Sequence, residues 1–144
     1  ADTEVGLDLS YWHYQVYQEQ RTTLGEPLMG FEELISPKNY GNSWNYSVGL
    51  LHRVTPAVEV MLGFHQDFSP IPEETFAVDT PTEDLIGFSA GARWQATERL
   101  KLGLGGIRNW YDLFDIQGSK TDPPTNIKAF GGITGLAFDV SWTL

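Results

Sequence analysis

Alternation of apolar and polar residues is the feature that most constrains how this chain can fold. Between Ser43 and Val54 the even positions carry mainly large apolar or aromatic side chains, and the odd positions carry mainly small or polar ones. Successive side chains of a β-strand point to opposite faces, so this period of two predicts a strand with one apolar face. The same period recurs and predicts six strands, at residues 4–17, 42–54, 57–68, 85–97, 100–116 and 126–144. All eight Pro lie outside these segments, and the alternation loses phase at Gly105-Gly106, where we expect a β-bulge.

Long and short connections alternate between the predicted strands. Residues 55–56 and 98–99 form short turns, whereas residues 18–41, 69–84 and 117–125 form long loops. Outer-membrane barrels have this pattern, with short turns on the periplasmic side, long loops outside and an even number of strands. Strands of about 9–11 residues are long enough to cross a bilayer at a tilt. The sequence therefore predicts an all-β fold, a transmembrane antiparallel up-and-down sheet or barrel of about six strands.

Aromatic side chains gather at the two ends of the predicted strands. Three tryptophans, Trp12, Trp44 and Trp110, lie near the long loops, and Trp94 and Trp142 lie near the short turns. Rings that are apolar on one side and polar on the other are selected at membrane–water interfaces. The tryptophans are therefore predicted to mark the two interfaces of a bilayer.

The period alone does not tell which way the apolar face points, so a soluble β-barrel with an apolar interior is the alternative. In that alternative the opposite face would meet water and carry charged residues and threonine. The mid-strand positions of that face are glycines: Gly49, Gly63, Gly87, Gly91, Gly103, Gly105, Gly131 and Gly135. Glycine weakens a strand and marks a close approach to the backbone or a bend of the sheet. These positions favour an apolar face toward lipid and a glycine-lined, ligand-facing interior.

Charged residues share the glycine face, and we expect them toward the short-turn end of the strands. They are Asp8, Arg53, Glu59, Arg93, Lys101 and Asp139. Opposite charges on adjacent strands predict a ladder of cross-strand ion pairs that neutralise one another in a confined interior. The alternative is a site for a lipid headgroup or a carboxylate, for which the guanidinium group of arginine is well shaped.

The long loops contain acidic clusters and one apolar stretch. The clusters Glu32-Glu33, Glu73-Glu74 and Glu83-Asp84 are expected to be solvated, and calcium binding between lipopolysaccharides is the alternative. The apolar residues of the first loop are Met29, Phe31, Leu34 and Ile35. They predict a short lid or helix over the opening, or a contact between copies of the chain.

No catalytic or metal site is predicted. The three histidines are scattered, and Ser10 and Ser141 have no base at a suitable spacing, so we expect neither an enzyme nor a cofactor. His65 and Asp67 share a face at a spacing that suits a metal. Without a third ligand the favoured interpretation is a hydrogen-bonded pair on the interior face.

Composition excludes several classes of function. The 144 residues are enough for one domain, which we place at residues 1–144. Nineteen Asp and Glu against nine Lys and Arg give a net charge of −10 with no basic block, so no nucleic-acid partner is expected. Without cysteine there is no disulfide or thiolate site, and no apolar run approaches the ~18 residues of a transmembrane helix. The start at Ala1, without an initiator Met or an apolar leader, is expected for a complete mature chain whose signal peptide was removed.

Four stretches between Tyr40 and the C-terminus form a recognisable series. They are Asn42-Ser43-Trp44 with Val48-Gly49-Leu50, Val60-Met61-Leu62-Gly63-Phe64 leading into Asp67-Phe68-Ser69-Pro70-Ile71-Pro72, Gly87 to Trp94, and Leu100 to Gly105. This series resembles the end of the FadL-type outer-membrane transporters of long-chain fatty acids and other hydrophobic compounds, and it covers about two-thirds of the chain. The resemblance implies a bacterial outer-membrane location and transport of such compounds. The resemblance implies a fourteen-stranded barrel with an N-terminal plug. This chain departs from that pattern, because it has six predicted strands and Leu144 in place of an aromatic last residue.

Six strands raise the question of how the sheet closes. About eight strands give a lumen that side chains just fill, so a closed six-stranded barrel conducts nothing, and an open sheet in lipid leaves unpaired edges. Two solutions are a homo-oligomer joined through the first and last strands, which the start at Ala1 favours, and the C-terminal piece of a longer barrel. The predicted function is to bind or pass hydrophobic, lipid-like molecules through an oligomeric, glycine-lined interior. The alternative is a structural outer-membrane oligomer that encloses lipid without transporting a substrate. Membrane lipids and a hydrophobic small molecule are the expected partners.

Overall fold

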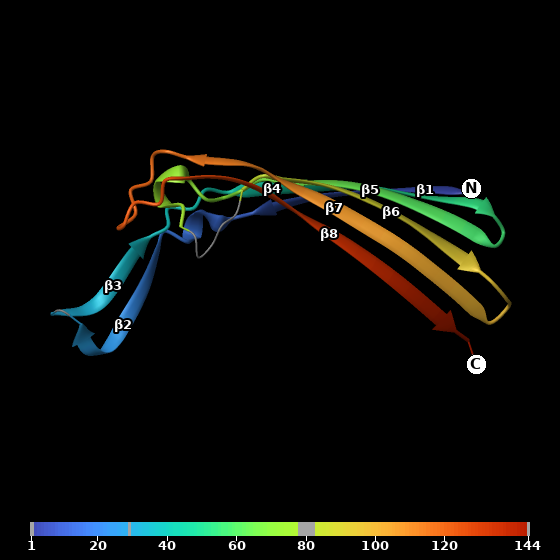
Figure 1. The fold of residues 1–144 in the computed structure, drawn as a ribbon, viewed down its shortest axis with the longest axis horizontal. Helices are drawn as coiled ribbons and strands as arrows, with labels where there is room; N and C mark the ends of the chain where they lie inside the picture. The colour runs from blue at the N-terminus through green and yellow to red at the C-terminus, as the bar shows by residue number, and fades with distance from the viewer. Residues whose placement is uncertain (1, 29, 78–82, 144) are drawn as a thin grey trace.

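The computed structural model describes residues 2–28, 30–77 and 83–143, without the side chains of Leu113 and Phe114. Six strands form one long twisted sheet, and two further strands form a separate hairpin (Figure 1). The sheet contains β1 (Thr3–Trp12), β4 (Ser43–Thr55), β5 (Val58–Asp67), β6 (Leu85–Gln95), β7 (Leu100–Ile116) and β8 (Ile127–Trp142). The hairpin contains β2 (Glu19–Leu28) and β3 (Phe31–Pro37). Two short 3-10 helices, η1 (Tyr14–Val16) and η2 (Glu73–Thr75), complete the described elements.

The six sheet strands pair in chain order, and every neighbouring pair is antiparallel. The chain ends and the β4–β5 and β6–β7 turns lie at one end of the sheet, which we call the turn end, and the long connections lie at the other, the loop end (Figure 1). The predicted all-β, up-and-down order of six strands is therefore confirmed. Among the described residues, none of the helices is long and apolar enough to cross a membrane.

The first long loop differs from its prediction. β1 ends at Trp12 rather than at residue 17, and the loop that follows contains the β2–β3 hairpin, which projects away from the sheet (Figure 1). Of the alternatives expected for Phe31, Leu34 and Ile35, the helix is wrong, because these residues lie in β3, whereas the lid and the contact between copies stay predictions. Met29 lies outside the described residues. The hairpin turns at Gly30, whose φ of 86° is a left-handed conformation that glycine adopts without strain.

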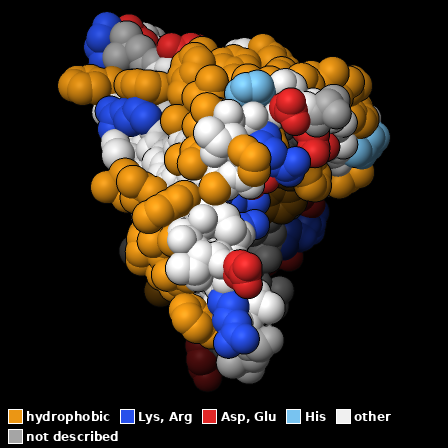
Figure 2. All heavy atoms as spheres, turned by 90° about the vertical axis from the view of Figure 1, so that its right-hand side faces the viewer, with side chains coloured by type: hydrophobic (Ala, Val, Ile, Leu, Met, Phe, Trp, Pro, Cys, Tyr) orange, Lys and Arg blue, Asp and Glu red, His pale blue; other side chains and the backbone are white. Residues whose placement is uncertain are grey.

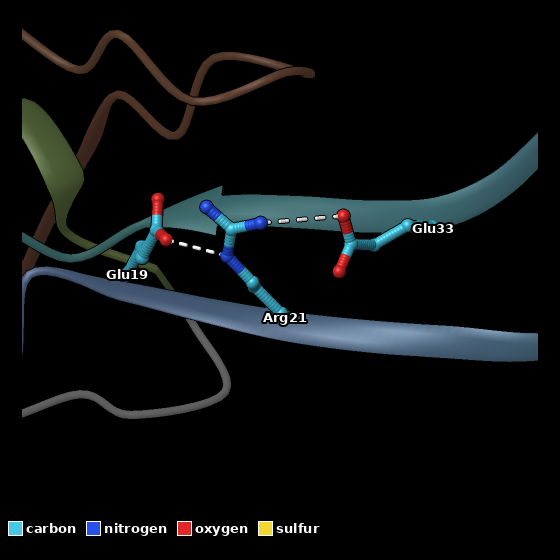
Figure 3. A network of polar contacts seen from close by, with 3 residues as sticks. All are labelled: Glu19, Arg21 and Glu33. Carbon is cyan, nitrogen blue, oxygen red and sulfur yellow. Dashed lines mark hydrogen bonds and ion pairs between the residues drawn. The ribbon is translucent and has the colours of Figure 1, made fainter.

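Ionic contacts tie the two strands of the hairpin together. The Arg21 guanidinium donates from Nε to Glu19 Oε1 at 2.5 Å and reaches Glu33 Oε2 from Nη1 at 3.4 Å (Figure 3). The hydrogen bond to Glu19, with the negative charges of Glu19 and Glu33, raises the pKa of Arg21. Because all three side chains are exposed, this network contributes little to stability. One carboxylate of the Glu32-Glu33 cluster is therefore engaged inside the hairpin.

The bulge expected at Gly105-Gly106 is absent from the described register. Gly105 pairs with Gly91 and Gly106 with Ala90 without a shift, and the irregularity in β7 lies between Tyr111 and Phe114. The alternation loses phase at the two glycines because Gly106 occupies a position on the apolar face that carries no side chain. The interruption of the pattern is therefore a change of side-chain size and leaves the backbone pairing intact.

The register gives the sheet two distinct faces. The apolar face carries rows such as Leu50, Leu62 and Ala90, while the other, the glycine face, carries rows such as Gly49, Gly63 and Ser89. Viewed from the turn end, hydrophobic side chains form a band along the upper and left margins, and charged side chains gather to its right (Figure 2). Side chains of the apolar face are uncovered: Leu7 is 78% exposed, Leu136 85% and Phe138 69%. Such a surface is the one that lipid covers in a membrane sheet.

The described buried side chains gather at the loop end, where the long connections interlock. Phe76 and Ile116 are the most buried hydrophobic residues, and the buried Thr75 hydroxyl donates to the carbonyl oxygen of the buried Lys38. Lys120 joins the third long loop to η2, because its backbone N–H donates to the Glu74 carbonyl at 2.8 Å and its ammonium meets the Glu74 carboxylate at 2.7 Å. The loop end is therefore a packed cap on the sheet.

Candidate functional site

The glycine face contains two kinds of glycine. Register puts all eight predicted positions on this face: Gly49, Gly63, Gly87, Gly91, Gly103, Gly105, Gly131 and Gly135. Gly49 and its neighbour Gly6 are open, because no atom of the described residues lies within 4 Å of the place where a Cβ would stand. Others are covered by neighbouring side chains; a Cβ on Gly63 would overlap the Ser89 hydroxyl, and one on Gly135 would stand 2.9 Å from Ile107 Cγ2.

A hollow of about 860 Å³ runs along this face over β5 to β8. Its floor includes Gly91, Gly103, Gly105 and Gly135, because residues without side chains leave the backbone open. Met61, Ile107 and Ala137 add apolar surface, while Arg93, Lys101 and Asp139 bring charge at the turn end. The hollow is therefore apolar for most of its length and charged at one end.

The charged residues form one ion-pair network rather than a continuous ladder. Glu59 lies between two arginines, with Oε1 at 3.3 Å from Arg53 Nη2 and Oε2 at 3.8 Å from Arg93 Nη1. Asp139 follows in the same row beyond Gly103, and a Cβ on Gly103 would stand 3.3 Å from Asp139 Cβ. Within the described part of the chain, Lys101 forms no ion pair. Two cations, Arg53 and Arg93, share the one carboxylate of Glu59, and with Lys101 and Asp139 this end of the face carries three cations and two anions.

Asp8 lies away from this network. It is in the row of Ser47, His65 and Gly87, nearer the loop end than predicted, and its carboxylate accepts a hydrogen bond from Ser10 at 3.0 Å.

In the same row, two strands from Asp8, the His65 ring lies over Gly87 on β6. A Cβ on Gly87 would overlap both the His65 ring and Asn109 Oδ1, so the two side chains meet over this glycine. Asn109 Oδ1 is buried and has no hydrogen-bond partner among the described residues. Asp67 lies in the next row, opposite Asn45, and among residues 2–28, 30–77 and 83–143 no group of three or more metal-ligating side chains is present. Asn109 was not among the predicted site residues. Its place in the alternation indicated the glycine face, but nothing in the sequence indicated that it lies next to His65.

Four of the five predicted interface tryptophans lie on the apolar face. Trp44 and Trp110 lie toward the loop end and Trp94 and Trp142 toward the turn end. Trp44 contacts Tyr11, with ring centroids 4.6 Å apart, and Trp110 meets Phe88 edge-on at 6.0 Å. Trp12, at the end of β1, is in register with the glycine face and stacks on Tyr14.

Carboxylates of the second long loop and of β7 lie close together at the loop end. Burial raises the pKa of Glu83, and the negative charges of Asp84, Asp112 and Glu73 raise it further. Glu74, which follows Glu73 in η2, is engaged with Lys120.

Comparisons with known proteins agree with this geometry. A family model described as outer membrane protein transport protein (OMPP1/FadL/TodX) matches residues 4–127. Among solved structures, the crystal structure of a Pseudomonas aeruginosa FadL homologue matches with a TM-score of 0.74 and 19% identity, covering 97% of this chain and 32% of that one. The chain thus spans about a third of the length of that homologue. A search of curated proteins gave no match.

Proposed function

The chain belongs to the OMPP1/FadL/TodX family of outer membrane transport proteins, and from this we propose that its glycine face lines a passage for hydrophobic, lipid-like molecules. The location in the outer membrane, the transmembrane β-fold and the assignment to transport rather than catalysis follow from the family. The observation that carries the proposal is the hollow of about 860 Å³ over β5 to β8, which is floored by glycine and charged at one end.

The chemistry of the hollow suits an amphipathic molecule with one negative group. Met61, Ile107 and Ala137 offer apolar contacts to an acyl chain, and the glycine floor lets the chain lie against the backbone. Arg93 and Lys101 stand at the turn end, where they would meet a carboxylate leaving the passage. A long-chain carboxylate is therefore the substrate class that we propose.

A passage needs a closed wall, and β1 and β8 are the two edges of the described sheet. Unpaired edge groups in lipid are costly, so both edges must pair with further strands. A second copy of the chain, joined through these edges, is the partner that we propose. Native mass spectrometry of the full-length protein in mild detergent tests it: a defined oligomer supports the proposal, and a monomer whose longer chain supplies the remaining strands contradicts it.

The passage itself is tested with a side chain that fills it without disturbing the sheet. Gly49 is open toward the glycine face and lies on β4, next to the strands that floor the hollow, so the G49W variant should fold and extend its ring across the proposed passage. Uptake of a fluorescent long-chain fatty acid is measured in bacteria that lack their own transporter. We expect G49W to lower the initial uptake rate severalfold.

The matched control is V48W, which places the same ring one residue away on the apolar face, where Val48 is exposed. V48W should transport like the parent protein. Equal uptake by G49W and the parent, at equal amounts of folded protein, would contradict the proposal. Retained lipid with no uptake by either protein would favour enclosure of lipid over transport.

A further inference from the structure

Arg108 occupies an unusual place on the apolar face. It pairs with Phe88 on β6 and with Thr134 on β8, so its side chain leaves the sheet on the side of Phe64 and Val48. Among the described residues of the apolar rows between Trp94 and Trp110, it is the single charged side chain. A lipid-facing arginine is costly at the bilayer midplane and much less costly near the interface. Its environment should therefore show how the charge is accommodated.

Three neighbours hold the guanidinium group toward the loop end. Nη1 donates to Thr134 Oγ1 at 2.7 Å, and Cζ stands 5.3 Å from the centre of the Trp110 ring. A Cβ on Gly132 would stand 3.1 Å from Nη2 and 3.3 Å from Cζ, so the group lies over a position that only glycine leaves free. The charge is thus fixed at the row of Trp110, which the aromatic pattern assigns to the membrane interface. In the described part of the chain no carboxylate pairs with it.

An apolar hollow of about 670 Å³ begins at Arg108 and Thr134 on the same face. Its floor dips at Ala90 and Gly106, and Leu62, Phe88 and Leu136 border it. The hollow therefore extends from a fixed cation at the interface toward the middle of the bilayer.

We propose that this hollow binds one phosphorylated membrane lipid, with an acyl chain over Ala90 and Gly106 and its phosphate on the Arg108 guanidinium. Charge complementarity supports this occupant, because a guanidinium group matches the spacing of phosphate oxygens and this one has no acidic partner. The site lies on the opposite face from the proposed passage. It requires that the apolar face meets lipid, and it does not depend on transport.

Native mass spectrometry of the full-length protein tests the proposal with two probes of identical acyl chains, dioleoyl phosphatidylglycerol and dioleoylglycerol. The parent protein should retain one phosphatidylglycerol and prefer it by about tenfold. R108Q should abolish that preference, whereas R108K, which keeps the charge, should retain part of it. A90F should reduce retention of both lipids, and V140F, which adds a ring on the same face outside the hollow, should change neither.

If R108Q is folded, as judged by an unaltered heat-modifiable mobility, and still prefers phosphatidylglycerol to dioleoylglycerol, the proposal is overturned. Equal retention of oleate and phosphatidylglycerol would also overturn it, because the site would then serve a carboxylate. A cross-link from residue 108 to an acidic residue of a second copy would assign the cation to an oligomer contact instead. Fatty acid uptake should be normal in R108Q, which separates a failure of this site from a failure of the passage.

Discussion

Single glycines of the same face differ in what they tolerate. At Gly87 a methyl group would overlap both the His65 ring and Asn109 Oδ1, whereas at Gly49 it would meet nothing within 4 Å. We expect Gly87→Ala to lower the free energy of unfolding by about 1–3 kcal/mol, the usual cost of overpacking. Gly49→Ala should raise it by roughly 0.5 kcal/mol, because alanine loses less backbone entropy in a strand. Urea titration in phospholipid vesicles measures both, and equal effects would contradict the assignment of covered and open glycines.

Arg93 is expected to bind the carboxylate of the proposed substrate rather than its acyl chain. Its side chain is half exposed and shares Glu59 with Arg53, so a carboxylate bound there gains about 1 kcal/mol, a severalfold effect. Arg93→Gln should therefore slow uptake of a long-chain carboxylate severalfold and leave the alcohol of the same chain length unaffected. Arg99→Gln, in the β6–β7 turn, is the matched control. Equal losses for both compounds would indicate a structural role for Arg93.

At the scale of single residues, the sequence predicted faces better than contacts. Period-two alternation assigned the eight glycines to one face, and register places them together on one face. Opposite charges on adjacent strands also predicted cross-strand ion pairs, two of which meet at Glu59. The sequence did not reveal the meeting of His65 with Asn109, because that contact depends on how neighbouring strands align. Arg108 breaks the alternation of its own strand, and such a break is the sequence signal for the lipid site proposed above.

Among the elements, the second long loop carries the clearest dependence on pH. Burial raises the pKa of Glu83 above its ordinary value of 4.5, and Asp84, Asp112 and Glu73 add to the shift. The folded loop therefore binds this proton more tightly than the unfolded chain, so folding is favoured as pH falls through the raised pKa. Hydrogen exchange of residues 69–77 should slow on acidification from neutral pH, after correction for the intrinsic rate.

Glu83→Gln should give the parent's acid-level protection already at neutral pH and remove the dependence. Glu98→Gln, which changes a carboxylate at the turn end, should retain it. A pH dependence that survives in Glu83→Gln would assign the effect to another group.

The β2–β3 hairpin is an element that sequence patterns missed. Leu34 and Ile35 are adjacent, and Pro27 and Pro37 lie within its strands, so neither a period of two nor the absence of proline indicated a strand. The six sheet strands were predicted because each is long enough for the alternation to show. Contacts between the two strands, such as Arg21 with Glu33, depend on a register that neither strand shows by itself.

The hairpin should be dispensable for the sheet. The Lys38 N–H donates to the Gln18 carbonyl at 2.8 Å, so the two ends of the hairpin are already adjacent. Replacing residues 19–37 with Gly-Ser should leave the heat-modifiable mobility of the folded protein unchanged. Replacing residues 117–125 should lower the fraction of protein that shows this mobility, because Lys120 then no longer joins the third long loop to η2. Loss of folded protein in the first deletion would show that the hairpin supports the sheet.

For the whole molecule, the open edges decide what the described sheet is able to do alone. The strand order and the two faces of the sheet were predictable, because each strand pairs with one that is close to it in the chain. Closure of the sheet into a barrel depends on partners for β1 and β8, about which the alternation in these residues says nothing. The match over about a third of a solved FadL homologue agrees with a wall that other strands complete. A substitution in the edge strands β1 or β8 should therefore alter assembly more than a substitution in the inner strands β5 or β6.

Entry and exit of the six-stranded sheet lie at the same end (Figure 1). Adding or removing a unit of this kind would change the circumference of a barrel wall, and every other strand would keep its direction. Every loop elsewhere in such a wall stays on its own side of the membrane.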